Sequence, residues 1–130
     1  VTGVQTCALP ILLFSLMLAG MLLSGCHPEP VTQARDGNAD RGIQIISNSG
    51  CGSCHVIPGI GAADGRVGPP LTNLARRAYL AGALPNNFTN LVRWLQDPQA
   101  VVADTVMPDS GLDRTAAEDI AAYLYTLEGR

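Results

Sequence analysis

The residues best suited to chemistry lie together at positions 51–55, where the sequence reads Cys-Gly-Ser-Cys-His. Two cysteines separated by two residues and followed directly by a histidine form C-x-x-C-H, the attachment signature for c-type haem. Two thiols on one helical turn can reach the two vinyl groups along one porphyrin edge, and the adjacent imidazole can then meet the iron. The spacing predicts one haem c bound covalently through Cys51 and Cys54, with His55 as an axial ligand of the iron.

Three other kinds of site could use the same residues. A redox pair of the thioredoxin kind needs a preceding strand in a βαβ unit, and no strand pattern precedes Cys51. A structural zinc site needs four ligands, and beyond the motif only His27 is available, in a polar linker. A plain disulfide between the two cysteines leaves His55 without a role. The sequence favours haem attachment over these three alternatives.

A second axial ligand for the iron has one candidate. Methionine sulfur is the commonest partner of histidine in electron-transfer haem proteins. Of the three methionines, Met17 and Met21 lie in an apolar leader, which leaves Met107 in the segment Thr105-Val-Met-Pro. A loop methionine is more often a filler of the core. An iron without a sixth ligand, which would bind gases or peroxide, is the open alternative.

The chain before the motif divides into three segments. Residues 1–11 lack an initiator methionine and a basic region and resemble the translation of a sequencing adapter, so we exclude them from the fold. Residues 12–26 are an apolar run that ends in Leu-Ser-Gly-Cys and resembles a lipoprotein signal peptide with its lipobox. Cys26 is therefore predicted to carry the lipid, and an uncleaved anchor is the alternative. Residues 27–38 are rich in proline and polar residues and are expected to be a flexible linker.

Either kind of anchor places the domain on the periplasmic side of a bacterial membrane, in contact with membrane lipid. The net charge is −3, and all eight basic residues are scattered arginines. Nucleic acid is excluded as a partner, because binding it needs a basic stripe. No nucleophile–base pair, paired carboxylates or phosphate loop stands out. The sequence therefore favours an electron carrier over an enzyme.

Helical periodicity predicts three elements around the motif. One helix is expected over Asp40–Ser47, with Asn38 or Asp40 as its N-cap. A second is expected over Asn87–Gln96, because Asp97-Pro98 stops it. In the third, Thr115-Ala-Ala-Glu reads as a capping box, followed by apolar residues on one face as far as a glycine at position 129. The long connections over 56–70 and 98–114 carry no strand pattern, so a buried haem is expected to organise them.

From Ala39 onwards the residues resemble class I cytochromes c. Gly68-Pro-Pro-Leu is similar to the family's Gly-Pro-x-Leu segment, which implies that the carbonyl of Pro69 accepts a hydrogen bond from the proximal imidazole. It also implies that Leu71 packs on the haem. The resemblance implies an all-α domain over residues 39–130, a small cytochrome c fold of about three to five helices wrapped around one covalently bound haem.

The spacing from Asp97-Pro98 to the methionine also matches the family and extends the comparison. On that register the resemblance implies that Trp94 lies on the methionine side of the haem. It also implies that Thr105 reaches a propionate and that Arg77 neutralises the propionates. The alternatives are ordinary core for Trp94 and a solvated surface charge for Arg77. The family crosses its first and last helices at a small residue, which implies a contact between Gly42 and Tyr123.

The resemblance implies a carrier of single electrons in a respiratory chain, as donor to or subunit of a terminal oxidase. An electron-accepting subunit of a periplasmic dehydrogenase remains an alternative, as does a haem sensor or peroxidase with an open iron site. The sequence contains no lysine, whereas mitochondrial carriers use a lysine ring to find acidic partners. Docking is therefore expected to use an apolar patch, with weak salt dependence and with the anchor raising the local concentration.

Overall fold

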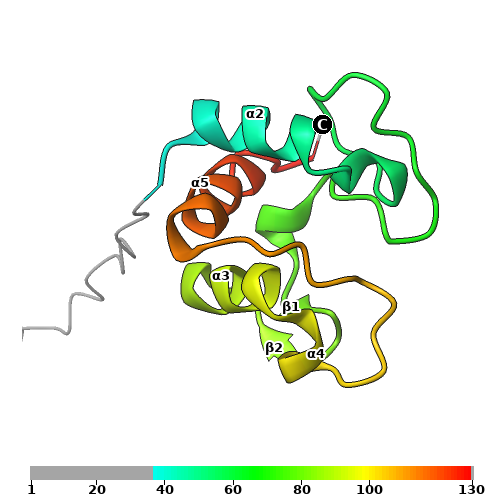
Figure 1. Cartoon of the computed structure of the whole chain (residues 1–130), viewed down its shortest axis with the longest axis vertical. Coiled ribbons are helices and arrows are strands. Elements are labelled where there is room, and N and C mark those ends of the chain that lie inside the picture. Colours follow the sequence, from blue (N-terminus) through cyan, green and yellow to red (C-terminus); the bar gives the residue numbers. More distant parts are fainter. Residues whose placement is uncertain (1–36, 130) are drawn as a thin grey trace, which may run out of the picture. The chain divides into compact units, whose positions relative to one another are not determined.

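The computed structural model describes residues 37–129. The segments predicted to be adapter-derived (1–11) and a signal peptide (12–26, with Cys26), and most of the linker, lie outside the described residues. The elements follow in the order α2 (Ala39–Asn48), η1 (Cys51–Ser53), η2 (Leu74–Arg76), β1 (Tyr79–Leu80), β2 (Leu84–Pro85), α3 (Phe88–Gln96), α4 (Pro98–Val101) and α5 (Arg114–Leu124) (Figure 1). Helices carry the fold, as predicted. Within the described residues, no helix is long and apolar enough to cross a membrane.

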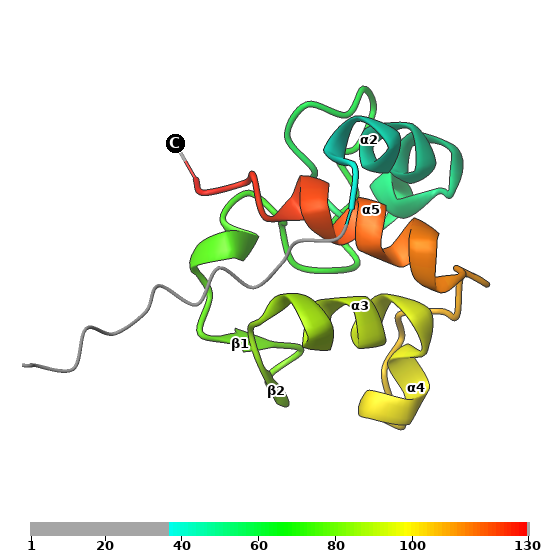
Figure 2. The same cartoon turned by 90° about the vertical axis from the view of Figure 1, so that its left-hand side faces the viewer.

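The first and last helices of this range, α2 and α5, pack directly against each other, and both views place them side by side (Figures 1 and 2). Their closest approach is at Gly42, which is buried. A Cβ atom at Gly42 would lie 2.8 Å from the carbonyl carbon of Asp119 and 3.1 Å from Cβ of Tyr123. The contact predicted between Gly42 and Tyr123 is confirmed, and the main chain of Asp119 lies closer still.

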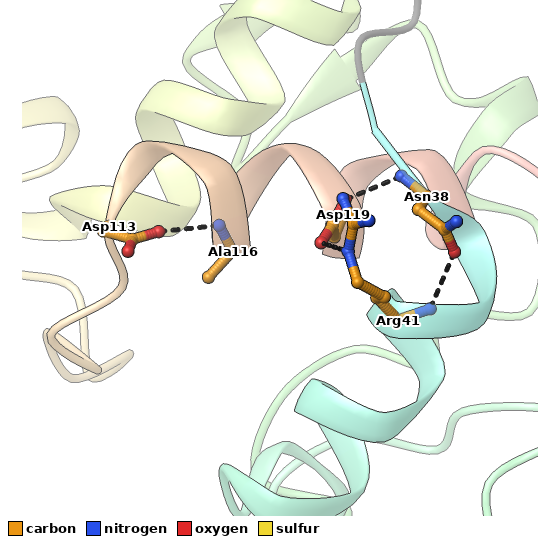
Figure 3. Close-up of polar contacts among 5 residues, drawn as sticks. All are labelled: Asn38, Arg41, Asp113, Ala116 and Asp119. Atoms are coloured by element: carbon orange, nitrogen blue, oxygen red, sulfur yellow. Dashed lines mark hydrogen bonds and ion pairs between the residues drawn. The ribbon is translucent and has the colours of Figure 1, made fainter.

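A charged contact fastens the same crossing. Arg41 Nε donates to Asp119 Oδ2 at 2.6 Å, and Arg41 Nη2 donates to Oδ1 at 2.8 Å (Figure 3). The backbone N–H of Asn38 also donates to Asp119 Oδ1, at 2.6 Å. Asp119 is 2% exposed, and the hydrogen bonds from Arg41 hold the pKa of its carboxyl below the ordinary value, although burial acts in the opposite direction. Asn38 is the N-cap of α2, one of the two predicted caps, since its side chain accepts from Arg41 N.

The predicted start of the last helix is wrong. Helix α5 begins at Arg114, and Asp113 is its N-cap, because Asp113 Oδ1 accepts from Ala116 N at 2.8 Å (Figure 3). Thr115 therefore lies inside the helix and forms no capping box. Glu118 does not reach back to a cap but accepts from Arg114 Nε at 2.7 Å. The helix also ends earlier than expected, at Leu124, and a turn follows it before the glycine at position 129.

Helix α3 ends where Asp97-Pro98 was predicted to stop it. Pro98 then begins a further short helix, α4, inside a stretch that was expected to be irregular. Asp97 serves both elements, since it is the C-cap of α3 and its side chain accepts from Ala100 N at 2.9 Å at the start of α4. The N–H of the first residue of a helix has no acceptor within the helix, so Pro98 loses nothing by lacking one. Helix α4 can therefore begin at Pro98, with Asp97 as its N-cap.

A small hairpin was not predicted. Strands β1 and β2 pair antiparallel over two residues each, too short to show alternation in the sequence. Asn86 follows β2 and joins three segments. Its Nδ2 donates to the carbonyls of Leu74 and Arg77 at 2.7 and 2.8 Å, and its Oδ1 accepts from Tyr125 Oη at 2.7 Å. This side chain ties the hairpin to η2 and to the turn after α5.

The core lies where α5 packs against α2 and α3. Leu91 and Leu95 of α3 and Leu124 of α5 are buried in it. Leu71 and Trp94 are half-buried and pack against this core. Each of the three main helices thus supplies apolar surface to one shared core, and α5 lies between the other two (Figure 2).

Candidate haem site

The C-x-x-C-H residues form one tight turn directly after α2. Cys51 begins the 3-10 helix η1, and the backbone N–H groups of Cys54 and His55 both donate to the carbonyl of Cys51, at 3.2 and 3.0 Å. This local pattern of hydrogen bonds holds the two thiols and the imidazole on one turn of main chain. The turn therefore brings together the three side chains that covalent attachment and ligation of one haem use.

Both cysteines are free thiols and half-buried. They do not form the disulfide that was one alternative. Burial raises the pKa of the Cys51 thiol, which keeps that thiol protonated at neutral pH in the chain without haem. Among residues 37–129, no group of three or more histidine, cysteine, aspartate or glutamate side chains could hold a metal ion. The zinc alternative therefore has no ligand set in the described range.

His55 is oriented by the main chain of the following loop. Its Nδ1 lies 2.8 Å from the carbonyl oxygen of Pro69. A carbonyl oxygen can only accept, so Nδ1 carries the proton and donates it in this hydrogen bond. The other ring nitrogen, Nε2, is then left with its lone pair, as an iron ligand requires. The donor set of the turn therefore fits a haem.

Gly68 provides the surface on which the imidazole rests. A Cβ atom at Gly68 would lie 2.6 Å from Nδ1 and 2.8 Å from Nε2 of His55, so only a glycine leaves room for the ring. The N–H of Gly68 donates to the carbonyl of Cys54 at 2.8 Å. Gly68 and Pro69 together form a main-chain cradle for His55. The sequence singled out this segment but not the steric role of its glycine.

Hydrogen bonds also organise the loop between His55 and Gly68. Tyr123 Oη donates to the carbonyl of Pro58, and burial raises the pKa of this phenol. Gly65 N donates to Gly52 O at 3.0 Å, next to an isolated bridge between Val56 and Asp64. The loop was expected to depend on a haem for its order, and these bonds supply part of that order from the chain itself.

Met107 lies half-buried against the core in the segment after α4. Its N–H donates to Thr105 Oγ1 at 3.2 Å, and its carbonyl accepts from Gln99 Nε2 at 2.8 Å. In Figure 1 this segment and the loop after His55 both extend to the right of α5 and α3. The sequence did not single out Gln99, because its partner is a main-chain carbonyl eight residues away.

The remaining predicted residues lie near these segments. The guanidinium of Arg77 donates to the carbonyl of Pro70, beside the cradle. That contact differs from a purely solvated surface charge. Thr105 uses its hydroxyl oxygen as an acceptor for the main chain of Met107. The predicted contacts of Arg77 and Thr105 with propionates, and of Leu71 and Trp94 with the ring, stay predictions.

A helical fold with a C-x-x-C-H turn and a histidine held by a carbonyl defines a covalent haem protein. The family model described as Cytochrome c matches residues 39–128. The chain therefore belongs to the cytochrome c family, of class I, and is an electron-carrying cytochrome. The family carries haem c through cysteines, and Cys51 and Cys54 bind the one haem of this chain. The predicted all-α cytochrome c fold and the predicted cofactor are confirmed.

Known proteins extend this comparison. Cytochrome c oxidase subunit 2 of Alkalihalophilus pseudofirmus is 36% identical over 91 residues, which are 69% of this chain and 26% of that protein. The same subunit of Bacillus sp. (strain PS3) is 34% identical over 89 residues, 65% of this chain and 25% of that protein. The chain thus spans about a quarter of the length of these curated relatives. The solved structure of cytochrome c2 from Rhodobacter sphaeroides covers 72% of this chain and 98% of its own, with a TM-score of 0.54 and 20% identity, and shows the fold.

Proposed function

We propose that this domain carries single electrons in a respiratory chain, with His55 and Met107 as the two axial ligands of its iron. The observation that carries the proposal is the His55 Nδ1 to Pro69 hydrogen bond, which leaves Nε2 available as a ligand. The bound haem supplies a one-electron change at iron. The chain keeps both ligands in place on either side of that change, so that little has to rearrange.

Residues around His55 and Met107 also help to keep these two proposed ligands in place. The cradle at Gly68 prevents the imidazole from turning, because its ring lies against the main chain. Thr105 and Gln99 hold the main chain of Met107 from two directions. Met107 packs against the core that contains the buried leucines of α3 and α5. An apolar environment at the haem would favour the reduced iron and raise its reduction potential.

We further propose that the partner is a terminal oxidase, either as a separate complex or as the assembly to which this domain belongs. The likeness to two proteins named cytochrome c oxidase subunit 2 supports this choice. Val67 and Val106 are 69% and 82% exposed and adjoin Gly68 and Met107 in the chain. Apolar side chains in these positions favour docking by an apolar patch rather than by charge.

The proposed place of action is the periplasmic side of a bacterial membrane. The lipobox-like ending at Cys26 supports a lipid anchor there, and the polar segment 27–38 supports a flexible connection to the domain. An anchored carrier meets membrane complexes at a raised effective concentration, which compensates for the lack of steering by lysines.

The proposal is tested by mixing the reduced, full-length haem protein with membranes that contain the host's terminal oxidase and measuring the rate at which the haem is oxidised. We expect fast oxidation whose rate changes less than about twofold between about 0.01 and 0.2 M salt, because an apolar contact is not screened. Val106→Asp should slow the oxidation, whereas Gln44→Asp on the exposed face of α2 should not. A steep fall with salt would contradict apolar docking. A carrier that the oxidase leaves reduced would favour the dehydrogenase alternative.

A further inference from the structure

The segment between α3 and Met107 has an ordered frame. Asp97 caps α4, and after the helix the chain continues through two backbone hydrogen bonds, from Val102 N to Pro98 O at 2.9 Å and from Thr105 N to Val102 O at 3.1 Å. These bonds fix the segment as far as Thr105. They do not reach the main chain of Met107 itself.

Two side chains make that last connection. In the part of the chain that the structure describes, the polar main-chain atoms of Met107 bond to the Thr105 hydroxyl at 3.2 Å and to the Gln99 amide at 2.8 Å. The Thr105 contact spans only two residues, so it does not fix the position of Met107 relative to helix α4. The Gln99 contact spans eight residues and joins the short helix α4 to the carbonyl of Met107.

We propose that Gln99 is a positioning residue for Met107, holding its main chain so that the sulfur stays directed at the iron. The inference rests on the proposed role of Met107 as an axial ligand. The hydrogen bond closes a ring from α4 to the methionine, and closure of a ring removes conformations in which the sulfur has moved away. Only a donor serves here, because the partner is a carbonyl oxygen.

Loss of the hydrogen bond from Gln99 should raise the fraction of molecules in which the sulfur of Met107 has left the iron. An added ligand such as imidazole binds the ferric protein only when the sulfur has left, so its apparent affinity reports the fraction of open molecules. Loss of an exposed hydrogen bond changes such an equilibrium by about two- to tenfold. Imidazole should therefore bind a variant without the donor about two- to tenfold more tightly.

Imidazole titration of the mature haem protein tests the inference with a small set of variants. Gln99→Glu keeps the size of the side chain and removes the donor at neutral pH, Gln99→Ala removes the side chain, and Gln99→Lys restores a donor. We expect Glu and Ala to tighten imidazole binding and Lys to stay within about twofold of the wild type. Gln44→Glu, on an exposed position of α2, repeats the change of charge away from the segment and should have no effect.

The results test the role of Gln99 and the role of Met107 separately. If the wild type shows the methionine–iron absorption band and the Glu and Ala variants bind imidazole as the wild type does, the role of Gln99 is refuted and Met107 remains a ligand. If Lys tightens binding as much as Ala does, the need for a donor is refuted. If the wild type shows no such band, the proposed ligand fails, and the role of Gln99 fails with it.

Discussion

At the scale of single residues, the proposed function depends on the imidazole of His55 being held in one orientation. The imidazole of His55 is fixed by its bond to Pro69 and by the absence of a side chain at Gly68. A hydrogen bond alone would let the ring pivot about Nδ1. The main chain of Gly68 blocks that rotation, so the two contacts together select the face that Nε2 presents.

Gly68→Ala should therefore disturb the proximal side. The added Cβ would lie 2.6 Å from Nδ1 of His55, and either the ring or the loop must shift. We expect a lower yield of covalent haem and a loss of about 1–3 kcal/mol in the free energy of unfolding, as for overpacked sites. Gly61→Ala is the matched control, because a Cβ there would meet nothing within 4 Å. Haem yield and urea unfolding equal to the control would refute the cradle.

Contacts between near neighbours could be predicted from the residues themselves, whereas long-range contacts could be predicted only where the family resemblance implied them, as between His55 and Pro69. The turn from Cys51 to His55 is built from bonds between near neighbours, so its form follows from its own residues. The bond from Tyr123 to Pro58 spans 65 residues, and no pattern near either of them announces it. Gln99 was missed for a related reason, since its partner is a main-chain atom that carries no signature in the sequence.

At the scale of elements, the crossing of α2 and α5 holds the domain together. Gly42 permits the close approach, and the pair of Arg41 with Asp119 fixes its direction. The helices themselves were predictable from periodicity and caps. Their ends were less so, because Asp113 and Thr115 are both good caps and only the folded chain shows which one is used. The partner of Asp119 lies 78 residues away and was not predictable.

The Arg41–Asp119 pair gives a prediction about acid stability. The pair lowers the pKa of Asp119 in the folded chain relative to its ordinary value of about 3.9. Its contribution is therefore complete above about pH 5 and is lost as the pH falls through the lowered folded pKa. Asp119→Asn should lower the urea midpoint at pH 7. It should also reduce the further decrease of that midpoint between about pH 5 and 3.

The control for this prediction is Asp40→Asn, which changes an exposed carboxyl in the first turn of α2. It should leave the acid dependence as in the wild type. If Asp119→Asn loses as much stability in acid as the wild type does, the pair contributes nothing to the pH dependence. Circular dichroism of the helices in urea follows both variants.

At the scale of the whole described domain, the chain joins a helical core to irregular segments that carry the proposed haem ligands. The helices α2, α3 and α5 share one core, whereas the segments next to His55 and Met107 are irregular and are held by main-chain hydrogen bonds together with the side chains of Tyr123 and Gln99. Periodicity predicted the three main helices, the resemblance to class I cytochromes c implied the all-α class, and the motif predicted the cofactor. The short helix α4 and the hairpin escaped prediction because elements of two to four residues are too short to show a period.

The proposed electron transfer requires that His55 and Met107 both bind the iron. The absorption spectrum of the ferric full-length protein at neutral pH tests this directly, through the weak band that methionine sulfur bound to ferric haem gives. The account predicts this band in the wild type. It also predicts that Met107→Ala loses the band, keeps its covalent haem and gains carbon monoxide binding when reduced. A wild type without the band, which already binds carbon monoxide when reduced, would contradict the account.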